Sequence, residues 1–264
     1  MMNLTIQQKL HYTLRLAVAM CFIGHGSFGI ITKEIWCNYF AVFGIGKTLA
    51  FQLMPWLGGF DIACGLVMLV YPMRLIPLWL LIWGIVTALL RPLSGEPFAE
   101  FIERAGNFGA PLALLMLSGG VNFKGLLTPI NSNTEIPANI LQKAVTCLKV
   151  VVFLLLAGHG WLNLIEKKGL MGQYTSLGFN NPALVAHLAG AFEIAAAVSV
   201  LVKPIRSVLL VFFIWKVATE LFYPHWVGFE WIERGGSYGC ILALWFALAK
   251  RNEALQSANN LQAA

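Results

Sequence analysis

Residues 14–32 read LRLAVAMCFIGHGSFGIIT, an apolar run long enough to cross a bilayer that carries one histidine, His25, between two glycines. The chain has 264 residues, of which 58% are hydrophobic and 11% are charged, and its mean hydropathy is +0.73. These values lie far from the balance of a soluble globular domain. The composition therefore predicts an all-α, multi-pass membrane protein surrounded by the lipid bilayer.

Other apolar stretches resemble the first in length, so the sequence predicts about eight transmembrane helices. The fourth and eighth are the shortest, and each begins only after an Ile-Glu-Arg triplet. No small-residue cleavage site follows the first stretch, so we expect no cleaved targeting segment. The eight stretches lie near residues 14–32, 49–71, 75–92, 105–120, 144–165, 183–202, 206–223 and 235–250.

The chain repeats its polar residues at similar spacing. Gly24-His25-Gly26 returns as Gly158-His159-Gly160, and Ile102-Glu103-Arg104 returns as Ile232-Glu233-Arg234. Asp61 corresponds in the same way to Glu193. This pattern predicts a tandem duplication of two four-helix units with the same orientation. The predicted parts are a first repeat (1–120), a polar linker (121–142), and a second repeat with a cytoplasmic tail (143–264).

Basic residues are distributed unevenly between the two sides that this topology defines. The side with both termini carries ten lysines and arginines against two acidic residues, whereas the other side carries seven against seven. The positive-inside rule then places both termini in the cytoplasm and the protein in the cytoplasmic (inner) membrane. Basic helix ends next to anionic lipid explain the net charge of +6, so no nucleic-acid partner is expected.

No electron carrier is recognisable in the sequence. The five cysteines form no Cys-x-x-Cys pair, and the chain has no arrangement of two histidines typical of haem ligation. A metal site is also not expected, because the histidines and carboxylates lack helical ligand spacing such as Glu-x-x-His.

The predicted topology brings the repeated polar residues to one depth, in the outer leaflet. We expect each half to close its own site, with these residues as candidates for catalysis or ligand binding. The first site would contain His25, Asp61, Glu103, Arg104 and Asn107, and the second His159, Glu193, Glu233, Arg234 and Ser237.

Each type of residue in these sites allows more than one role. The Glu-Arg doublets suit a helix start with a snorkelling arginine, or a buried pair held by the small residues that follow. The histidines can tie helices together through a carboxylate, or can transfer protons or bond a quinone carbonyl. Asp61 and Glu193 must be paired or protonated, and we expect them to pair with Arg104 and Arg234 or with the histidines.

The two halves also differ. Lys216 and Glu220 occur in the second half alone, four residues apart, where they can pair on one helix face. Arg91 occurs in the first half alone, before Pro92. These three residues are further candidates for ligand binding.

The stretch from Arg15 to Gly26, followed by an acidic residue in a glycine-rich second span, resembles the DoxX-like superfamily of four-span membrane proteins. The likeness recurs at Gly158-His159-Gly160 and Glu193, so the chain is similar to a fused pair of DoxX-type units. The resemblance implies association with membrane oxidoreductase complexes, since the family includes the small membrane subunit linked to thiosulfate:quinone oxidoreductase. Many of its members have no assigned activity.

Three functions remain open from the sequence. The first is a membrane subunit that binds quinone and works with a soluble or membrane oxidoreductase. The second is a proton-coupled transporter of a small solute, suggested by duplicated halves with acidic residues inside the membrane. Against it, no pair of helices is broken by glycine or proline at equivalent positions, apart from the glycines around the histidines. The third is a scaffold or chaperone-like subunit without chemistry. The sequence sets neither the ligand nor the oligomeric state, and it leaves open whether one site or both are active.

Overall fold

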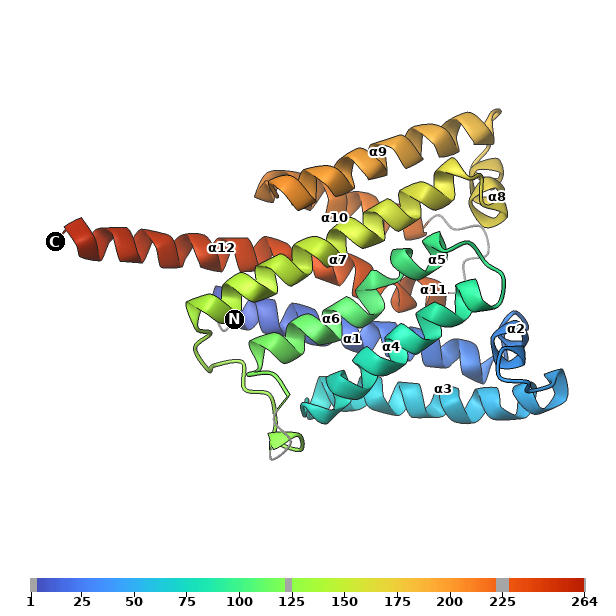
Figure 1. Cartoon of the computed structure of the whole chain (residues 1–264), viewed down its shortest axis with the longest axis horizontal. Helices are drawn as coiled ribbons and strands as arrows, with labels where there is room; N and C mark the ends of the chain where they lie inside the picture. Colours follow the sequence, from blue (N-terminus) through green and yellow to red (C-terminus); the bar gives the residue numbers. More distant parts are fainter. Residues whose placement is uncertain (1–3, 122–124, 222–227, 264) are drawn as a thin grey trace.

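The computed structural model describes residues 4–121, 125–221 and 228–263 (Figure 1). Within these ranges the regular secondary structure is helical, apart from an isolated β-bridge between Met73 and Pro129, and turns and loops join the helices. The twelve helices of the described residues are α1 (Ile6–Ile30), α2 (Trp36–Ala41), α3 (Lys47–Val70), α4 (Leu75–Leu93), α5 (Ala99–Glu103), α6 (Ala105–Leu117), α7 (Ala138–Leu164), α8 (Lys168–Ser176), α9 (Pro182–Val202), α10 (Arg206–Leu221), α11 (Gly228–Glu233) and α12 (Gly235–Ala263).

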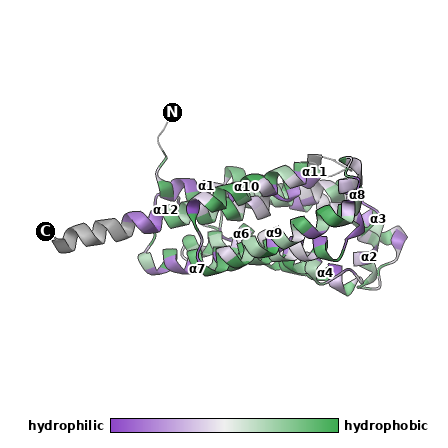
Figure 2. Ribbon diagram, turned by 90° about the horizontal axis from the view of Figure 1, so that it is seen from above, coloured by the Kyte–Doolittle hydropathy of each residue, from purple (hydrophilic) through white to green (hydrophobic). Residues whose placement is uncertain are grey.

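Five of the described helices, α1, α3, α4, α7 and α9, are long and apolar enough to cross a membrane. Hydrophobic residues extend along the helices, and hydrophilic residues lie toward both ends (Figure 2). The chain is therefore a multi-pass helical membrane protein, but the number of eight crossings stays a prediction. Helices α6 and α10 have 13 and 16 residues, fewer than the roughly 20 of a typical span. The predicted seventh span also includes residues 222 and 223, which lie outside the described ranges.

The two ends of the bundle are different. Helix α1 begins and α12 ends toward the same end, where the segment joining α6 to α7 also lies, and we call this the terminal end (Figure 1). The short helices α2, α5, α8 and α11 gather at the opposite end, which we call the site end (Figure 1). The side chain of Gln7 donates to the carbonyls of Ser132 and Thr134, which fastens the start of α1 to the joining segment.

Helices from distant parts of the chain pack closely together. Helix α1 packs along α3, and α7 packs along α9. Helices α11 and α12 also contact α1, while α5 and α6 contact α7. The main core contains buried residues from α1, α6, α7 and α12, among them Leu14, Leu114, Leu148 and Leu244. The first and second halves of the sequence are thus packed into each other.

Glycines make these crossings close. A Cβ atom on Gly24 of α1 would lie 2.2 Å from the backbone nitrogen of Glu233, and one on Gly158 of α7 would lie 2.3 Å from that of Glu103. Helices α6 and α12 cross where a Cβ on Gly106 would lie 2.6 Å from the backbone of Gly236. Small residues allow such close approach of helix backbones in membrane proteins.

Helices α1 and α7 end in the same way. Thr32 and Glu166 follow them, each with a left-handed φ of 53° that is uncommon for residues other than glycine. The next backbone nitrogens donate back into the helix, from Lys33 to the carbonyl of Phe28 and from Lys167 to that of Leu162. This helix-ending motif directs the chain sharply away from the axis. It places two lysines, Lys33 and Lys167, at the site end.

Candidate functional site

His25 of α1 lies between two carboxylates from different helices. Its Nδ1 is 3.3 Å from Glu233 Oε1, and its Nε2 is 3.8 Å from Asp61 Oδ2. Trp83 Nε1 donates to the same Asp61 oxygen over 3.3 Å. The histidine ring also lies 4.6 Å, centroid to centroid, from the ring of Trp36 in α2. Both nitrogens of the imidazole therefore face carboxylate oxygens.

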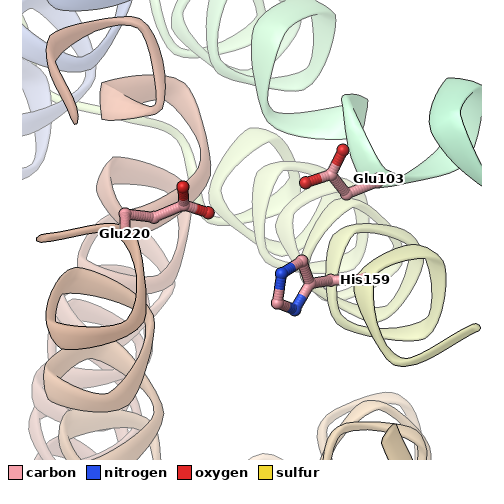
Figure 3. Close-up of side chains that lie close together, drawn as sticks. All are labelled: Glu103, His159 and Glu220. Atoms are coloured by element: carbon pink, nitrogen blue, oxygen red, sulfur yellow. The ribbon is translucent and has the colours of Figure 1, made fainter. Parts of the chain in front are cut away.

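His159 of α7 occupies a similar but more enclosed place. Its Nδ1 is 2.6 Å from Glu193 Oε2, and Trp215 Nε1 donates to Glu193 Oε1 over 3.0 Å. The side chains of Glu103 and Glu220 converge on His159, and one ligand atom from each of the three lies within 4.8 Å of the others (Figure 3). All three residues are buried.

The expectation that each half closes its own site is wrong. Glu233, from the second half, contacts His25 of the first, and Glu103, from the first half, lies beside His159 of the second. The reason is the packing of α11 on α1 and of α5 on α7, which the glycines at positions 24 and 158 permit. The two histidine sites thus exchange their glutamates.

Asp61 and Glu193 pair with the histidines, as one of the two predicted arrangements proposed, and the arginine pairing is wrong. Arg104 Nη1 instead donates to Glu100 Oε2 and Glu103 Oε2, over 2.5 and 2.9 Å. Arg234 Nη1 donates to Glu103 Oε1 over 2.5 Å. The doublets therefore form a buried network that joins the halves, rather than snorkelling separately.

Glu100 anchors this network on the first-half side. It contacts Arg91, Arg104 and Lys167, and its side chain is fully buried. Burial alone would raise the pKa of Glu100, but Arg104 and Lys167 outweigh that effect and lower the pKa to about 2. Glu100 is therefore ionised at neutral pH and holds its cations in place. Its spacing of four residues from Arg104 is a helical pairing signal that the sequence already carried.

The predicted pair of Lys216 and Glu220 forms, with 2.9 Å between Nζ and Oε1. Both residues are buried beside the His159 site, and Arg234 Nε lies 3.8 Å from Glu220 Oε2. Asn163 and Tyr174 close the other side, since the Tyr174 hydroxyl donates to Asn163 Oδ1 over 2.6 Å. The cavity left beside His159 has a volume of only about 20 Å³. The second site is closed and filled by ion pairs.

The first site opens instead into a cavity of about 110 Å³, the His25 cavity. One part of its wall is polar, and the remainder is aromatic or apolar apart from Thr87. The polar residues are His25, Arg91, Arg104, Asn107 and Glu233, and the others are Trp36, Tyr39, Phe40, Phe43, Ile45, Leu57, Trp83, Thr87 and Leu90.

A larger and more polar cavity lies between the two sites, with a volume of about 300 Å³; we call it the vestibule. It shares Arg91, Arg104 and Glu233 with the His25 cavity, and it shares Lys167, Glu220 and Arg234 with the small cavity beside His159. The vestibule therefore adjoins both histidine sites. Its remaining lining residues are Lys33, Ile35, Asn38, Ser94, Glu96 and Glu230.

The predicted counterparts Asn107 and Ser237 have different surroundings. Asn107 lines the His25 cavity. Ser237 is buried where α6 crosses α12, and its backbone nitrogen would lie 2.6 Å from a Cβ on Gly106. Ser237 lines none of the three cavities described above. It therefore contributes to helix packing.

Sequence reasoning missed the contribution of α2 to the first site. Trp36 and Tyr39 stand three residues apart on α2, so one face of this short helix lines the His25 cavity. Tyr39 donates to Glu96 Oε1 over 2.5 Å, and Arg91 lies over its ring at 5.2 Å. Burial raises the pKa of Tyr39 well above its ordinary value, so the phenol stays protonated. The spacing of three residues between Trp36 and Tyr39 was the sequence signal that could have indicated an aromatic helix face here.

Glu103, His159 and Glu220 are also the described residues with a geometry suited to a metal ion. Glu193 would orient the histidine from behind, as carboxylates do at many metal sites. Yet Glu103 already contacts Arg104 and Arg234, and Glu220 contacts Lys216. A metal ion would have to displace these cations, so the local charges disfavour one.

Two helices are interrupted at equivalent places, each at an arginine rather than at a glycine or proline. Helix α5 ends before Arg104 and α6 begins after it, and Arg234 separates α11 from α12 in the same way. The nitrogens of Asn107 and Ser237 each donate over 2.9 Å to the carbonyl three residues earlier, which is that of the interrupting arginine. Such tight turns mark functional breaks in other helices. Neither glycine nor proline stands at the break, which is why the pattern was not recognised.

The fold and the site define a multi-pass helical membrane protein with a buried ion-pair network and one amphipathic cavity. Comparison of the chain with protein-family models, with curated proteins and with solved structures finds no match. The resemblance to the DoxX-like superfamily stays a prediction.

Proposed function

We propose that this protein is a quinone-binding membrane subunit that works with an oxidoreductase, and that the His25 cavity is its quinone site. The main observation behind this proposal is the lining of that cavity, which combines aromatic and apolar residues with His25, Arg91 and Asn107. A quinone headgroup has a flat apolar ring and two carbonyl acceptors, and ligand sites commonly combine an apolar wall with a few placed polar groups. A cavity of this order accepts one six-membered ring.

Individual contacts fit a quinone. Trp36 lies beside the imidazole of His25, so a flat ring entering here can stack on the indole. Guanidinium groups and side-chain amides donate hydrogen bonds to carbonyl oxygens, and Arg91 and Asn107 supply both kinds of donor in this wall. Asp61 and Glu233 hold His25 from both sides and can return a proton to it. No electron carrier is recognisable in the sequence, so reduction of the quinone requires a soluble or membrane oxidoreductase partner.

The proposal includes the DoxX-like arrangement of two fused four-span units. Eight crossings would be completed by α6, α10 and α12, with both termini on the cytoplasmic side of the inner membrane. The exchanged glutamates, the matching ends of α1 and α7, and the equivalent breaks at Arg104 and Arg234 support a duplicated origin. The site end would then lie in the outer leaflet.

Replacing Trp36 by leucine should weaken the binding of a short-chain ubiquinone about tenfold, because the stacking surface beside His25 is lost. Quenching of intrinsic tryptophan fluorescence during titration of the purified protein measures this affinity. Trp161→Leu is the matched control, since Trp161 is 44% exposed and does not line the His25 cavity. Equal affinities in wild-type protein and both variants, or no saturable binding in any of them, would rule out the quinone site.

Transport is the second candidate function, and the paired breaks at Arg104 and Arg234 favour it. Transporters often form their substrate sites from interrupted helices in both repeats. Vesicles containing the protein and a pH-sensitive dye should then show solute-dependent proton entry that Asp61→Asn abolishes. His187→Gln is the control, because His187 is half-exposed and pairs with Glu166 away from both sites. Proton entry that Asp61→Asn leaves unchanged would contradict proton coupling through this carboxylate.

The third candidate, a scaffold, has support from one site alone. The cavity beside His159 is small, the pair of His159 and Glu193 joins α7 to α9, and Arg234 contacts both Glu220 of α10 and Glu103 of α5. The open His25 cavity is the feature that distinguishes a ligand-binding protein from a purely structural one.

A further inference from the structure

We propose that the vestibule is a separate binding site for an anionic group, namely a carboxylate, sulfate or phosphate, held by Arg91, Arg104 and Arg234. This inference does not depend on the quinone proposal. The vestibule is larger than the His25 cavity, about 300 Å³ against about 110 Å³. It also takes lining residues from both halves of the chain.

The three arginines have donors to spare. The described hydrogen bonds of their guanidinium groups all use Nη1: from Arg91 to Glu96, from Arg104 to Glu100 and Glu103, and from Arg234 to Glu103. Their Nη2 atoms are not among the fully buried side-chain atoms without a partner in the described residues. None of these nitrogens is thus both fully buried and unpartnered among the described residues, and the vestibule is the cavity that all three arginines line.

The carboxylates behind the arginines orient them. Glu100 and Glu103 are buried and bind the Nη1 edge of Arg104, and Glu103 also binds Arg234. A guanidinium fixed along one edge presents the other edge in a defined direction, which suits two-point recognition of a carboxylate or phosphate. The network thus holds guanidinium groups of residues that line the vestibule.

The side chains that line the vestibule carry one cation more than carboxylates, and the buried Glu100 and Glu103 behind them hold four of these cations in place. Its lining contains five cations and four carboxylates. Two of these carboxylates have cationic or imidazole partners outside the lining of the vestibule, because Glu220 pairs with Lys216 and Glu233 contacts His25. The other two pair with lining residues, Glu96 with Arg91 and Glu230 with Lys33. Lys33 and Lys167 are the two lining cations just beyond the ends of α1 and α7, where Lys33 pairs with Glu230 and Lys167 pairs with Glu100.

The same anionic chemistry can come from a free solute or from the headgroup of an anionic lipid. Both would approach from the site end, where Lys33, Glu96, Lys167 and Glu230 line the vestibule and lie outside the long helices. The experiment must therefore offer the two sources separately.

Binding of radiolabelled inorganic phosphate to the purified full chain in neutral detergent tests the site. We expect saturable binding that sulfate competes for and that Arg91→Gln weakens at least about tenfold, as for the loss of a charge-assisted pair. Arg15→Gln is the matched control. Arg15 lies toward the terminal end and donates to the carbonyls of Met68 and Leu69, so its replacement should leave phosphate binding unchanged. Arg91→Lys keeps the positive charge but loses the planar guanidinium that can bind an anion at two points. This variant should therefore have an intermediate phosphate affinity.

The lipid source is tested in parallel by reconstitution into nanodiscs of phosphatidylcholine with or without phosphatidylglycerol, followed by native mass spectrometry. Retained phosphatidylglycerol that is lost in Arg91→Gln but kept in Arg15→Gln supports the site and assigns it to a headgroup. Phosphate binding in neutral nanodiscs supports the site and assigns it to a free anion. Absence of both signals in wild-type protein overturns the proposal, and so does an Arg91→Gln variant that elutes as a folded monodisperse species and binds like wild type. No quinone is present, so this outcome is independent of the quinone titration.

Discussion

Replacing Glu103 by glutamine is expected to lower the free energy of unfolding by about 3–5 kcal/mol, the usual cost of removing one partner from a buried ion pair. Glu103 is 2% exposed and accepts from Arg104 over 2.9 Å and from Arg234 over 2.5 Å. The neutral amide would leave both guanidinium groups with weaker partners in a low-dielectric interior. Reversible unfolding of the purified protein in mixed micelles, followed by circular dichroism, measures the change.

Glu230→Gln provides the comparison for this variant. Glu230 also pairs with a cation across the two halves, Lys33 at 3.1 Å, but the side chains are 19% and 36% exposed. A partly solvated pair contributes about 1 kcal/mol or less. If the two variants lose similar stability, the buried network does not hold the halves together as described.

Replacing Gly24 by alanine should be the most disruptive single-methyl change in α1. The new Cβ would lie 2.2 Å from the backbone nitrogen and 2.6 Å from the Cα of Glu233. Backbone atoms cannot rotate away, so α11 must move from α1, and we expect a loss of about 3 kcal/mol or more, at the upper end of overpacking costs. The same movement should withdraw Glu233 from His25. The melting temperature in detergent and the quinone affinity should therefore fall together.

Gly59→Ala is the matched control for this prediction. Gly59 lies within α3 two residues before Asp61, and a Cβ there meets nothing within 4 Å. Alanine is the better helix former by about 1 kcal/mol in solution measurements, so this variant should be neutral or slightly stabilised. Equal melting temperatures for Gly24→Ala and wild type would show that α11 does not pack on α1 at this distance.

The sequence predicted those features that depend on local patterns. Long apolar runs predicted five helices that the structure bears out as candidate spans, α1, α3, α4, α7 and α9. The spacing of Lys216 and Glu220 predicted their pair. The pairing of Asp61 and Glu193 with histidines was one of two expected arrangements, because burial of an unpaired carboxylate would be too costly.

Features that depend on packing between the halves could not be read from the same patterns. Glu103 and Glu233 stand in the same Ile-Glu-Arg triplet, so the sequence does not show which histidine each one contacts. In the structure each glutamate lies beside the histidine of the other half. The difference in cavity volume was equally hidden, since it results from how α2, α8 and the pair of Lys216 and Glu220 fill space. Both features depend on how helices that are far apart in the sequence pack together, rather than on the type of residue at any one position.

The exchange of glutamates has a consequence for biosynthesis. Glu233 follows His25 by 208 residues, so the ribosome makes α1 long before it makes α11. Until α11 arrives, His25 has Asp61 as its nearby acid, and Arg234 is not yet there to meet Glu103. A nascent chain that stops in the region joining α10 to α11 therefore holds an unbalanced set of charges in its apolar interior. Synthesis of α11 and of the arginine that follows it completes these pairs, through Glu233 with His25 and Arg234 with Glu103.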